Sequence, residues 1–180
     1  MAFNVQEFRA QFQYGGARKN LFKCLITFPG IVPGGSAAGA KAEFMCKTAQ
    51  MPGSTINAID VGYFGRKLKV PGDRTFDELS LTIINDEDYL VRRAFEEWSN
   101  GLNAHVLNVR NPAALETNQY QSDLTLVHYD KIGQENKRYK FVGVWPSAIQ
   151  GEDHGWEDND SISETQVTMQ YQWWQSDTTD

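Results

Sequence analysis

The chain is organised around the stretch from Val61 to Leu102, which reads VGYFGRKLKVPGDRTFDELSLTIINDEDYLVRRAFEEWSNGL. Its first part is a basic connection, its middle is a strand with alternating apolar residues, and its last part is a helix with an apolar stripe. The sequence on both sides of this stretch is mostly strand-like. We therefore predict a mainly β domain in which this stretch determines how the β-rich body meets its surroundings.

The helix of this stretch is predicted to start at about Asn85 and to end near Gly101. Residues 85–88 supply side-chain oxygens and negative charge for a helix N-terminus, and Gly101 is a suitable C-terminal stop. Arginines and glutamates four positions apart give the helix a charged outer face. The residues of its packing face lie three and four positions apart: Leu90, Val91, Ala94, Phe95 and Trp98.

The basic connection precedes the strand at 78–84. The segment 70–73 reads Val-Pro-Gly-Asp, with Pro and Gly at the central positions that suit a type II turn, so we expect the chain to reverse there. Before it, residues 55–63 alternate with apolar side chains on both faces. That pattern predicts a strand that is covered on both sides.

The rest of the chain adds further strands and loops. A Gly-rich segment after Pro29 predicts a flexible loop, residues 103–122 a loop excursion, and residues 152–160 an acidic loop. Alternation of apolar residues predicts strands at 21–28, 43–49, 123–129, 137–145 and 165–173, with a hairpin around 131–136 and an end at Trp145-Pro146. About seven strands and one helix indicate a β-sandwich or barrel with the helix against one face. We divide the chain into an N-terminal arm (1–20), one main domain (21–174) and a C-terminal tail (175–180).

Composition narrows the class of protein. With 180 residues, 41% hydrophobic and 22% charged, the chain is long enough for one domain with its own core. A formal net charge of -6 does not fit a protein that grips nucleic acid through phosphates. The sequence contains no run of about 18 apolar residues and no signal-peptide pattern at its start, so we expect a soluble intracellular product with no membrane segment. Cys24 and Cys46 are predicted to be free, buried thiols.

No pattern in the sequence predicts catalysis, a metal site or a cofactor. The Gly-rich loop at 34–39 lacks the Lys and Ser/Thr of a phosphate-binding loop, and the acidic loop lacks the spacing of a calcium-binding loop. The three histidines, His105, His128 and His154, lie far apart and have no cysteine or second histidine beside them. The basic and aromatic residues at 63–69 could stack on a single nucleic acid strand, but a protein contact or a solvated turn explains them as well.

Several runs of residues resemble the tail tube protein of contractile-tailed bacteriophages. The most specific of them is the run from Val61 to Phe76, which contains Gly-Asp-Arg-Thr-Phe. The others are Phe44-Met45-Cys46-Lys47, Ile84-Asn85-Asp86-Glu87 with Trp98, Gly143-Val144-Trp145-Pro146, and the acidic loop followed by Tyr171-Gln172-Trp173. The resemblance extends in the same order from about Asn20 to Trp174.

The resemblance implies a structural protein without enzymatic activity. It implies a small β-barrel-like subunit with a flanking helix, six copies of which close into a homohexameric ring whose strands join one barrel. Stacked rings would form the tail tube of the virion, inside a contractile sheath, between a baseplate and a tube terminator, and DNA would pass through it non-specifically into the host. Two related hypotheses stay open: a tube-like baseplate or adaptor protein, and the inner tube of a phage-derived injection or secretion machine. A monomeric module that binds a small ligand or carbohydrate through Trp156 or Trp174 is a further alternative.

The same resemblance suggests where the copies touch. The connection from Phe64 to Arg74 is long and basic in a chain that is otherwise acidic, so we predict that it reaches a neighbouring subunit or ring. The residues predicted to make these contacts are Phe64, Arg66, Lys67, Lys69, Asp73 and Arg74.

Overall fold

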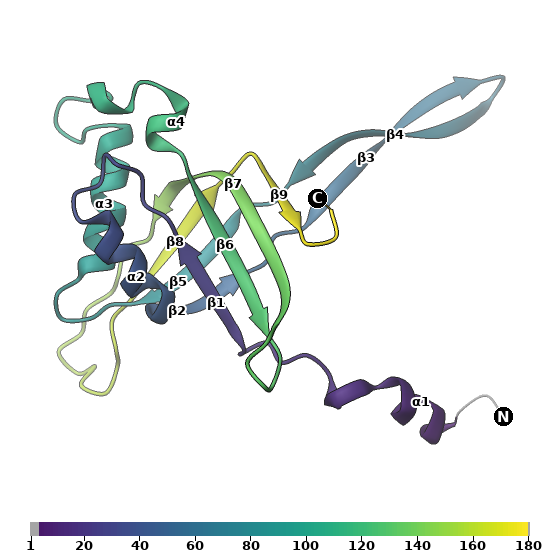
Figure 1. Cartoon of the computed structure of the whole chain (residues 1–180). Coiled ribbons are helices and arrows are strands. Elements are labelled where there is room, and N and C mark those ends of the chain that lie inside the picture. The colour runs from purple at the N-terminus through teal and green to yellow at the C-terminus, as the bar shows by residue number, and fades with distance from the viewer. Residues whose placement is uncertain (1–3, 180) are drawn as a thin grey trace.

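Two separate antiparallel sheets form the β-structure in the computed structural model, which describes residues 4–179 (Figure 1). In the larger sheet the strands follow the order β1-β6-β7-β8-β5-β2, and β9 also pairs with β7. Its strands are β1 (Phe22–Ile26), β2 (Cys46–Gln50), β5 (Leu79–Ile84), β6 (Ser122–Tyr129), β7 (Glu135–Ile149), β8 (Glu164–Gln170) and β9 (Trp173–Ser176). The smaller sheet is a long hairpin of β3 (Ser54–Tyr63) and β4 (Arg66–Phe76), which projects away from the body in Figure 1.

Two of the helices pack on the larger sheet. These are α2 (Gly35–Met45) and α3 (Leu90–Leu102), which lie side by side at one end of the body (Figure 1). The other helical segments are short: α1 (Val5–Gln11), η1 (Gln13–Gly15), η2 (Pro112–Ala114) and α4 (Thr117–Tyr120). The predicted fold class, mainly β with a flanking helix, is confirmed, and the helical content is larger than expected.

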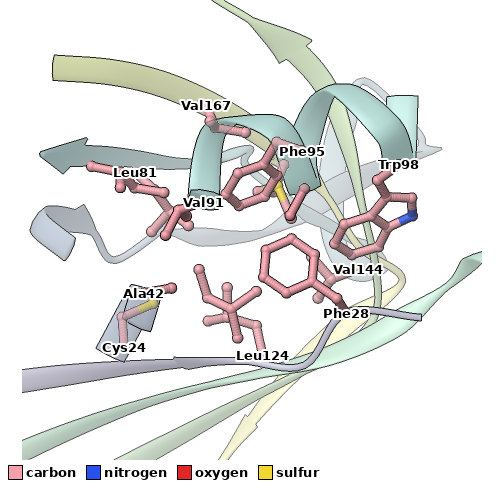
Figure 2. Packing of buried hydrophobic residues seen from close by; sticks show 14 of the residues in the cluster. Cys24, Phe28, Ala42, Leu81, Val91, Phe95, Trp98, Leu124, Val144 and Val167 are labelled. Carbon is pink, nitrogen blue, oxygen red and sulfur yellow. The ribbon is translucent and has the colours of Figure 1, made fainter. Parts of the chain in front are cut away.

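The core lies between the larger sheet and the two packed helices. Leu79, Leu81 and Ile83 on alternate positions of β5 are buried, as their two-residue period requires. Phe95 and Trp98 of α3 are fully buried against Phe28, whose ring centroid lies 5.1 Å and 5.6 Å from theirs (Figure 2). Aromatic rings at this spacing fill the space between helix and sheet at low cost in side-chain entropy.

The α3 helix begins later than its sequence suggests. Its first residue is Leu90, whose backbone N–H donates to the Asp88 side chain over 3.0 Å. The carboxylates of Asp86 and Asp88 both accept from Lys41 Nζ of α2, over 2.7 Å and 2.6 Å. The hydrogen bond from Lys41 lowers the pKa of both carboxyls and raises the pKa of the lysine. Asp86 and Asp88, which were predicted to lie at the helix N-terminus, therefore also link α2 to α3 through Lys41.

The prediction of a flexible Gly-rich loop is wrong, because α2 occupies that segment. The glycines there permit close packing instead. A Cβ on Gly39 would lie 2.6 Å from the backbone oxygen of Ile26, and a Cβ on Gly35 would lie 2.8 Å from the Cβ of Phe28. With Ala38 and Ala42 also fully buried, the helix lies almost directly on β1.

Two predicted chain breaks fall inside strands. Pro71 and Gly72 do not make the expected turn, because Pro71 pairs with Ala58 inside the hairpin and the chain reverses at Phe64-Gly65, where φ is 41° and 81°. A register shift next to Ala58 absorbs the Pro-Gly pair as a bulge. Likewise β7 runs through Pro146 to Ile149, with a register shift after Pro146.

The predicted final strand, 165–173, is divided in two. Residues up to Gln170 belong to β8 and pair with both β5 and β7, whereas β9 begins at Trp173 and pairs with residues 139–142 of β7. The β6–β7 hairpin is confirmed, and the acidic segment between β7 and β8 has no regular structure. Both cysteines are free; Cys24 is buried and Cys46 half-buried.

Candidate assembly surfaces

The β3–β4 hairpin presents one apolar face to solvent. Residues paired across an antiparallel ladder point to the same side, so the pairs Val61 with Leu68 and Ile59 with Val70 lie on one face. All four side chains are exposed, Leu68 by 66%. Four aliphatic side chains on one exposed ribbon form a patch of the kind that marks an interaction site. We call these four residues the apolar hairpin face.

The opposite face and the tip of the hairpin are basic and aromatic. Lys67 and Lys69 lie on the opposite face, where Lys67 pairs with Asp60 over 3.2 Å. Within residues 4–179, Arg66 and Lys69 have no ion-pair partner. At the reversal Phe64 is 91% exposed, and its ring lies 4.6 Å from that of Tyr63.

The six predicted contact residues all lie on this hairpin, but at different levels. Phe64 is at the tip, and Arg66, Lys67 and Lys69 follow it on β4. Asp73 and Arg74 lie near the base, beside the bulge, where Arg74 Nη1 donates to Ser54 Oγ over 3.0 Å.

Sequence reasoning missed the apolar hairpin face. The alternation of Ile59, Val61 and Tyr63 indicates one strand with an apolar side, but the sequence does not show that Leu68 and Val70 continue this side on the partner strand. Placing the turn at Pro71 instead of Phe64 hid that pairing. The Phe64-Gly65 pair between two alternating runs was the sequence signal that could have found it.

The predicted packing face of α3 points into the body. Val91, Ala94, Phe95 and Trp98 are buried, and Leu90 is half-buried against the core. Trp98 Nε1 donates to the backbone oxygen of Tyr120 over 2.7 Å, which satisfies its only polar atom. On the outer side, Arg92 and Glu96 form an ion pair of 2.9 Å.

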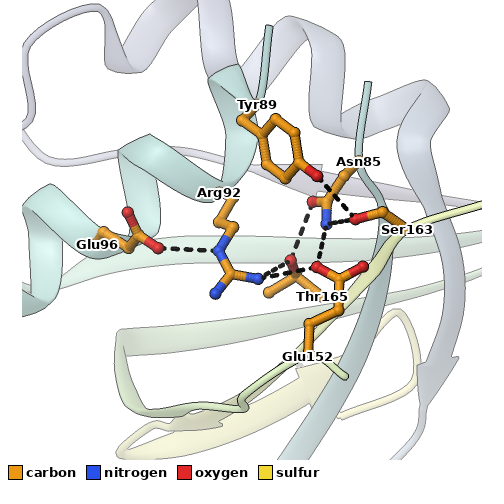
Figure 3. A network of polar contacts seen from close by, with 7 residues as sticks. All are labelled: Asn85, Tyr89, Arg92, Glu96, Glu152, Ser163 and Thr165. Atoms are coloured by element: carbon orange, nitrogen blue, oxygen red, sulfur yellow. Dashed lines mark hydrogen bonds and ion pairs between the residues drawn. The ribbon is translucent and has the colours of Figure 1, made fainter. Parts of the chain in front are cut away.

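A network of polar side chains joins the start of α3 to both ends of the acidic loop (Figure 3). Asn85 donates to Ser163 Oγ over 2.7 Å and accepts from Thr165 Oγ1 over 2.9 Å. Arg92 donates to Thr165 Oγ1 over 3.1 Å and pairs with Glu152 over 3.4 Å. Thr165 and Asn85 are buried, so these bonds satisfy groups that water does not reach. The network fixes the loop at the residues where it leaves and re-enters the sheet.

Between those anchors the acidic loop is fully open to solvent. Its residues 153–160 are all exposed, and Trp156 is completely exposed. In the described part of the chain, none of the four carboxylates in this range, on Asp153, Glu157, Asp158 and Asp160, has a cationic partner. Large exposed tryptophan surface beside unpaired charge is typical of an interface residue.

Two kinds of site are absent from the described residues 4–179: a cluster of metal-ligating side chains and a helix that could cross a membrane. Their His, Cys, Asp and Glu side chains form no group of three or more that could hold a metal ion. None of the helices there combines the length and the apolar character needed to cross a membrane.

Comparison with known sequences identifies relatives across nearly the whole chain. A family model described as phage tail tube protein matches residues 17–177. The tail tube protein gp19 of Enterobacteria phage T4 is 28% identical over 175 residues, which cover 95% of this chain and 99% of that protein. The tail tube protein of Serratia phage KSP90 is 27% identical over 81% of each chain.

Solved structures of contractile injection systems share the fold. The cap that terminates the tube of the anti-feeding prophage superposes with a TM-score of 0.61 at 16% identity and covers 91% of each chain. A chain of the sheath-tube complex of an extracellular contractile injection system, PVC, in its extended state gives 0.60 at 12% identity and covers 97% of this chain and 98% of that one. At these identities the likeness concerns the fold alone.

Proposed function

The chain belongs to the phage tail tube protein family, and we propose that six copies of it close into a ring and that such rings stack into the inner tube of a contractile phage tail. The family is structural, not enzymatic. In the proposed assembly, strands of adjacent copies lie side by side and form one ring-wide barrel, because pairing removes sheet edges that would otherwise stay open.

The observation that carries this proposal is the apolar hairpin face. A two-stranded ribbon on its own is marginally stable in water, and this one exposes Ile59, Val61, Leu68 and Val70 together. A second copy that covers this face would bury the patch and stabilise the ribbon at the same time. The predicted contact residues, from Phe64 to Arg74, are therefore proposed to lie in the interface between subunits or rings.

The charge of the chain fits a conduit for DNA. A net charge of -6 over the whole chain opposes tight binding of a polyanion, so DNA would pass without being trapped by counterion release. The proposed partners are further copies of this chain, a tail sheath protein, a baseplate and a tube terminator. The protein would be made in the host cytoplasm and reside in the virion.

An inner tube of a phage-derived injection machine is the second candidate. The fold likeness to the anti-feeding prophage and PVC chains supports it. The sequence relatives favour the phage tail, because those at 26–28% identity are phage tail tube proteins.

Negative-stain electron microscopy of the purified chain tests the proposal. We expect hollow tubes or six-fold rings at high protein concentration near neutral pH. Leu68→Asp on the apolar hairpin face should abolish them, whereas Ile132→Asp, at an exposed apolar residue of the β6–β7 turn, should not. A strictly monomeric wild-type chain, or tubes that form normally with Leu68→Asp, would contradict the proposed function.

A further inference from the structure

We infer that the basic tip of the hairpin docks on the acidic loop of a second copy of this chain, with Trp156 as the apolar anchor of that contact. The inference rests on the proposed function and extends it, because it names the surface that receives the hairpin.

The opposite charges of the hairpin tip and the acidic loop are the reason for choosing the loop as the docking surface. Directly after the tip, β4 carries Arg66, Lys67 and Lys69 within four residues, and Arg66 and Lys69 lack an ion-pair partner among residues 4–179. In the same described residues, the acidic loop holds four carboxylates that lack one as well. After Lys140 the sequence contains no lysine or arginine, so no cation of the C-terminal segment neutralises the loop. Opposite charges on two surfaces of one chain steer copies together in one orientation and disfavour others.

Both surfaces also carry exposed aromatic rings. Tyr63 and Phe64 stack edge to face at the tip, and Trp156 stands free in the loop. Aromatic anchors surrounded by charged residues are the usual make-up of an interface whose centre is apolar and whose rim is polar. A contact built from charges alone would gain little in water, and the rings give it apolar area to bury.

The positions of the hairpin tip and the acidic loop on the molecule would allow the same contact to repeat from copy to copy. Figure 1 places the hairpin and the yellow-green connection between β7 and β8 at opposite ends of the molecule in that view. A contact between two different surfaces of identical copies is heterologous, and heterologous contacts propagate from copy to copy into rings or filaments. The ends of the loop are fixed by Glu152 and Ser163 through the network of Figure 3, so the acceptor is held on the body while its middle stays open.

A charge swap tests the pairing. The hairpin variant Arg66→Glu with Lys69→Glu, and the loop variant Asp153→Lys with Glu157→Lys, should each lower the amount of assembled protein by about tenfold or more. Combining the two variants should restore assembly. The matched control pairs the hairpin variant with Glu7→Lys and Glu97→Lys, which gives the same net charge at other exposed carboxylates and should not restore it.

Cross-linking with a carbodiimide supplies a second measurement, independent of tube formation. This reagent joins lysine to carboxylate only in direct contact, and a mixture of light and isotope-labelled chains identifies links between copies. We expect links between Lys67 or Lys69 and the acidic loop in concentrated wild-type protein.

The inference is overturned if the loop variant assembles like wild type, if the charge swap does no better than its control, or if the tip lysines link only to other surfaces. A loop variant that assembles normally but loses binding to purified sheath protein would also overturn it and assign the loop to the sheath. Failure of the proposed function looks different, because then the wild-type chain forms no tubes at all.

Discussion

Leu81 in the body and Leu68 in the hairpin occupy similar local structure and opposite environments. Each lies in an antiparallel strand with apolar residues at alternate positions, yet Leu81 is 0% and Leu68 66% exposed. The body covers its apolar side with α2 and α3, whereas nothing else in residues 4–179 covers the apolar hairpin face. The alternation of a strand thus indicates that one side will be buried, but it does not say whether the same chain or another one covers it.

The largest expected effect compares these two leucines directly. Leu81→Ala should lower the free energy of unfolding of the monomer by about 2–5 kcal/mol, because it leaves a cavity in a closed core. Leu68→Ala should change it by no more than about 0.5 kcal/mol but weaken assembly. Urea denaturation of both variants under conditions where the wild type is monomeric measures the difference. Equal losses would mean that the hairpin folds back on the body in solution.

The polar network gives the next comparison. Asn85→Ala should cost about 1–3 kcal/mol, because the buried Thr165 hydroxyl loses its acceptor. Asn57→Ala, at an exposed position of the hairpin, should lie within about 0.5 kcal/mol of wild type. Thermal unfolding of the two variants provides the measurement, and a neutral Asn85→Ala would show that water or another group replaces the amide.

Two glycines of the hairpin differ in the space that an added Cβ would have. A Cβ on Gly72 would lie 2.9 Å from the backbone oxygen of Asn57 and 3.0 Å from Ile59, so Gly72→Ala should change the bend at the bulge. A Cβ on Gly62 meets nothing within 4 Å. We expect Gly72→Ala to slow tube growth several-fold and also to lower the stability of the monomer, because the backbone of β3 must shift to make room for the Cβ. Gly62→Ala should change neither. Light scattering during assembly measures the rate of tube growth. Equal rates for Gly72→Ala and wild type would show that the shape of the bulge does not matter for assembly.

The smallest effect concerns pH and the body alone. Burial, with a further contribution from the Asp77 carboxylate, raises the pKa of Tyr171 to about 12, and its hydroxyl donates to the backbone oxygen of Asp77. Because the folded pKa exceeds the unfolded value of about 10, the contribution of this tyrosine is complete below pH 10 and is lost as the pH rises toward 12. Solvent screening should keep it below about 1 kcal/mol. Denaturation at pH 9 and 11 should show a shallower loss for Tyr171→Phe than for wild type, and identical slopes would contradict this.

Local patterns predicted the elements whose apolar residues recur at one regular period. The strand at Leu79–Ile84, the β6–β7 hairpin and the apolar stripe of α3 follow from side-chain period alone, since one face of each packs on a single core. The predicted loop at Gly35–Gly39 and the predicted turn at Pro71-Gly72 were wrong because local sequence does not show which distant segments pack there. Glycine and proline usually mark turns, but here distant segments use them for a close helix–strand approach and for a bulge.

The sequence by itself determined the fold class, the packing stripe of the helix and the family, because side-chain period and motif order are properties of the chain. Only the tertiary structure decided which apolar faces stay open. Burial depends on what lies opposite a strand in space, and nothing in the described residues 4–179 lies opposite the apolar face of the β3–β4 hairpin. The cross-strand pairing that gathers Ile59, Val61, Leu68 and Val70 on one side, and the unpaired charges at the tip, became visible once the register was known.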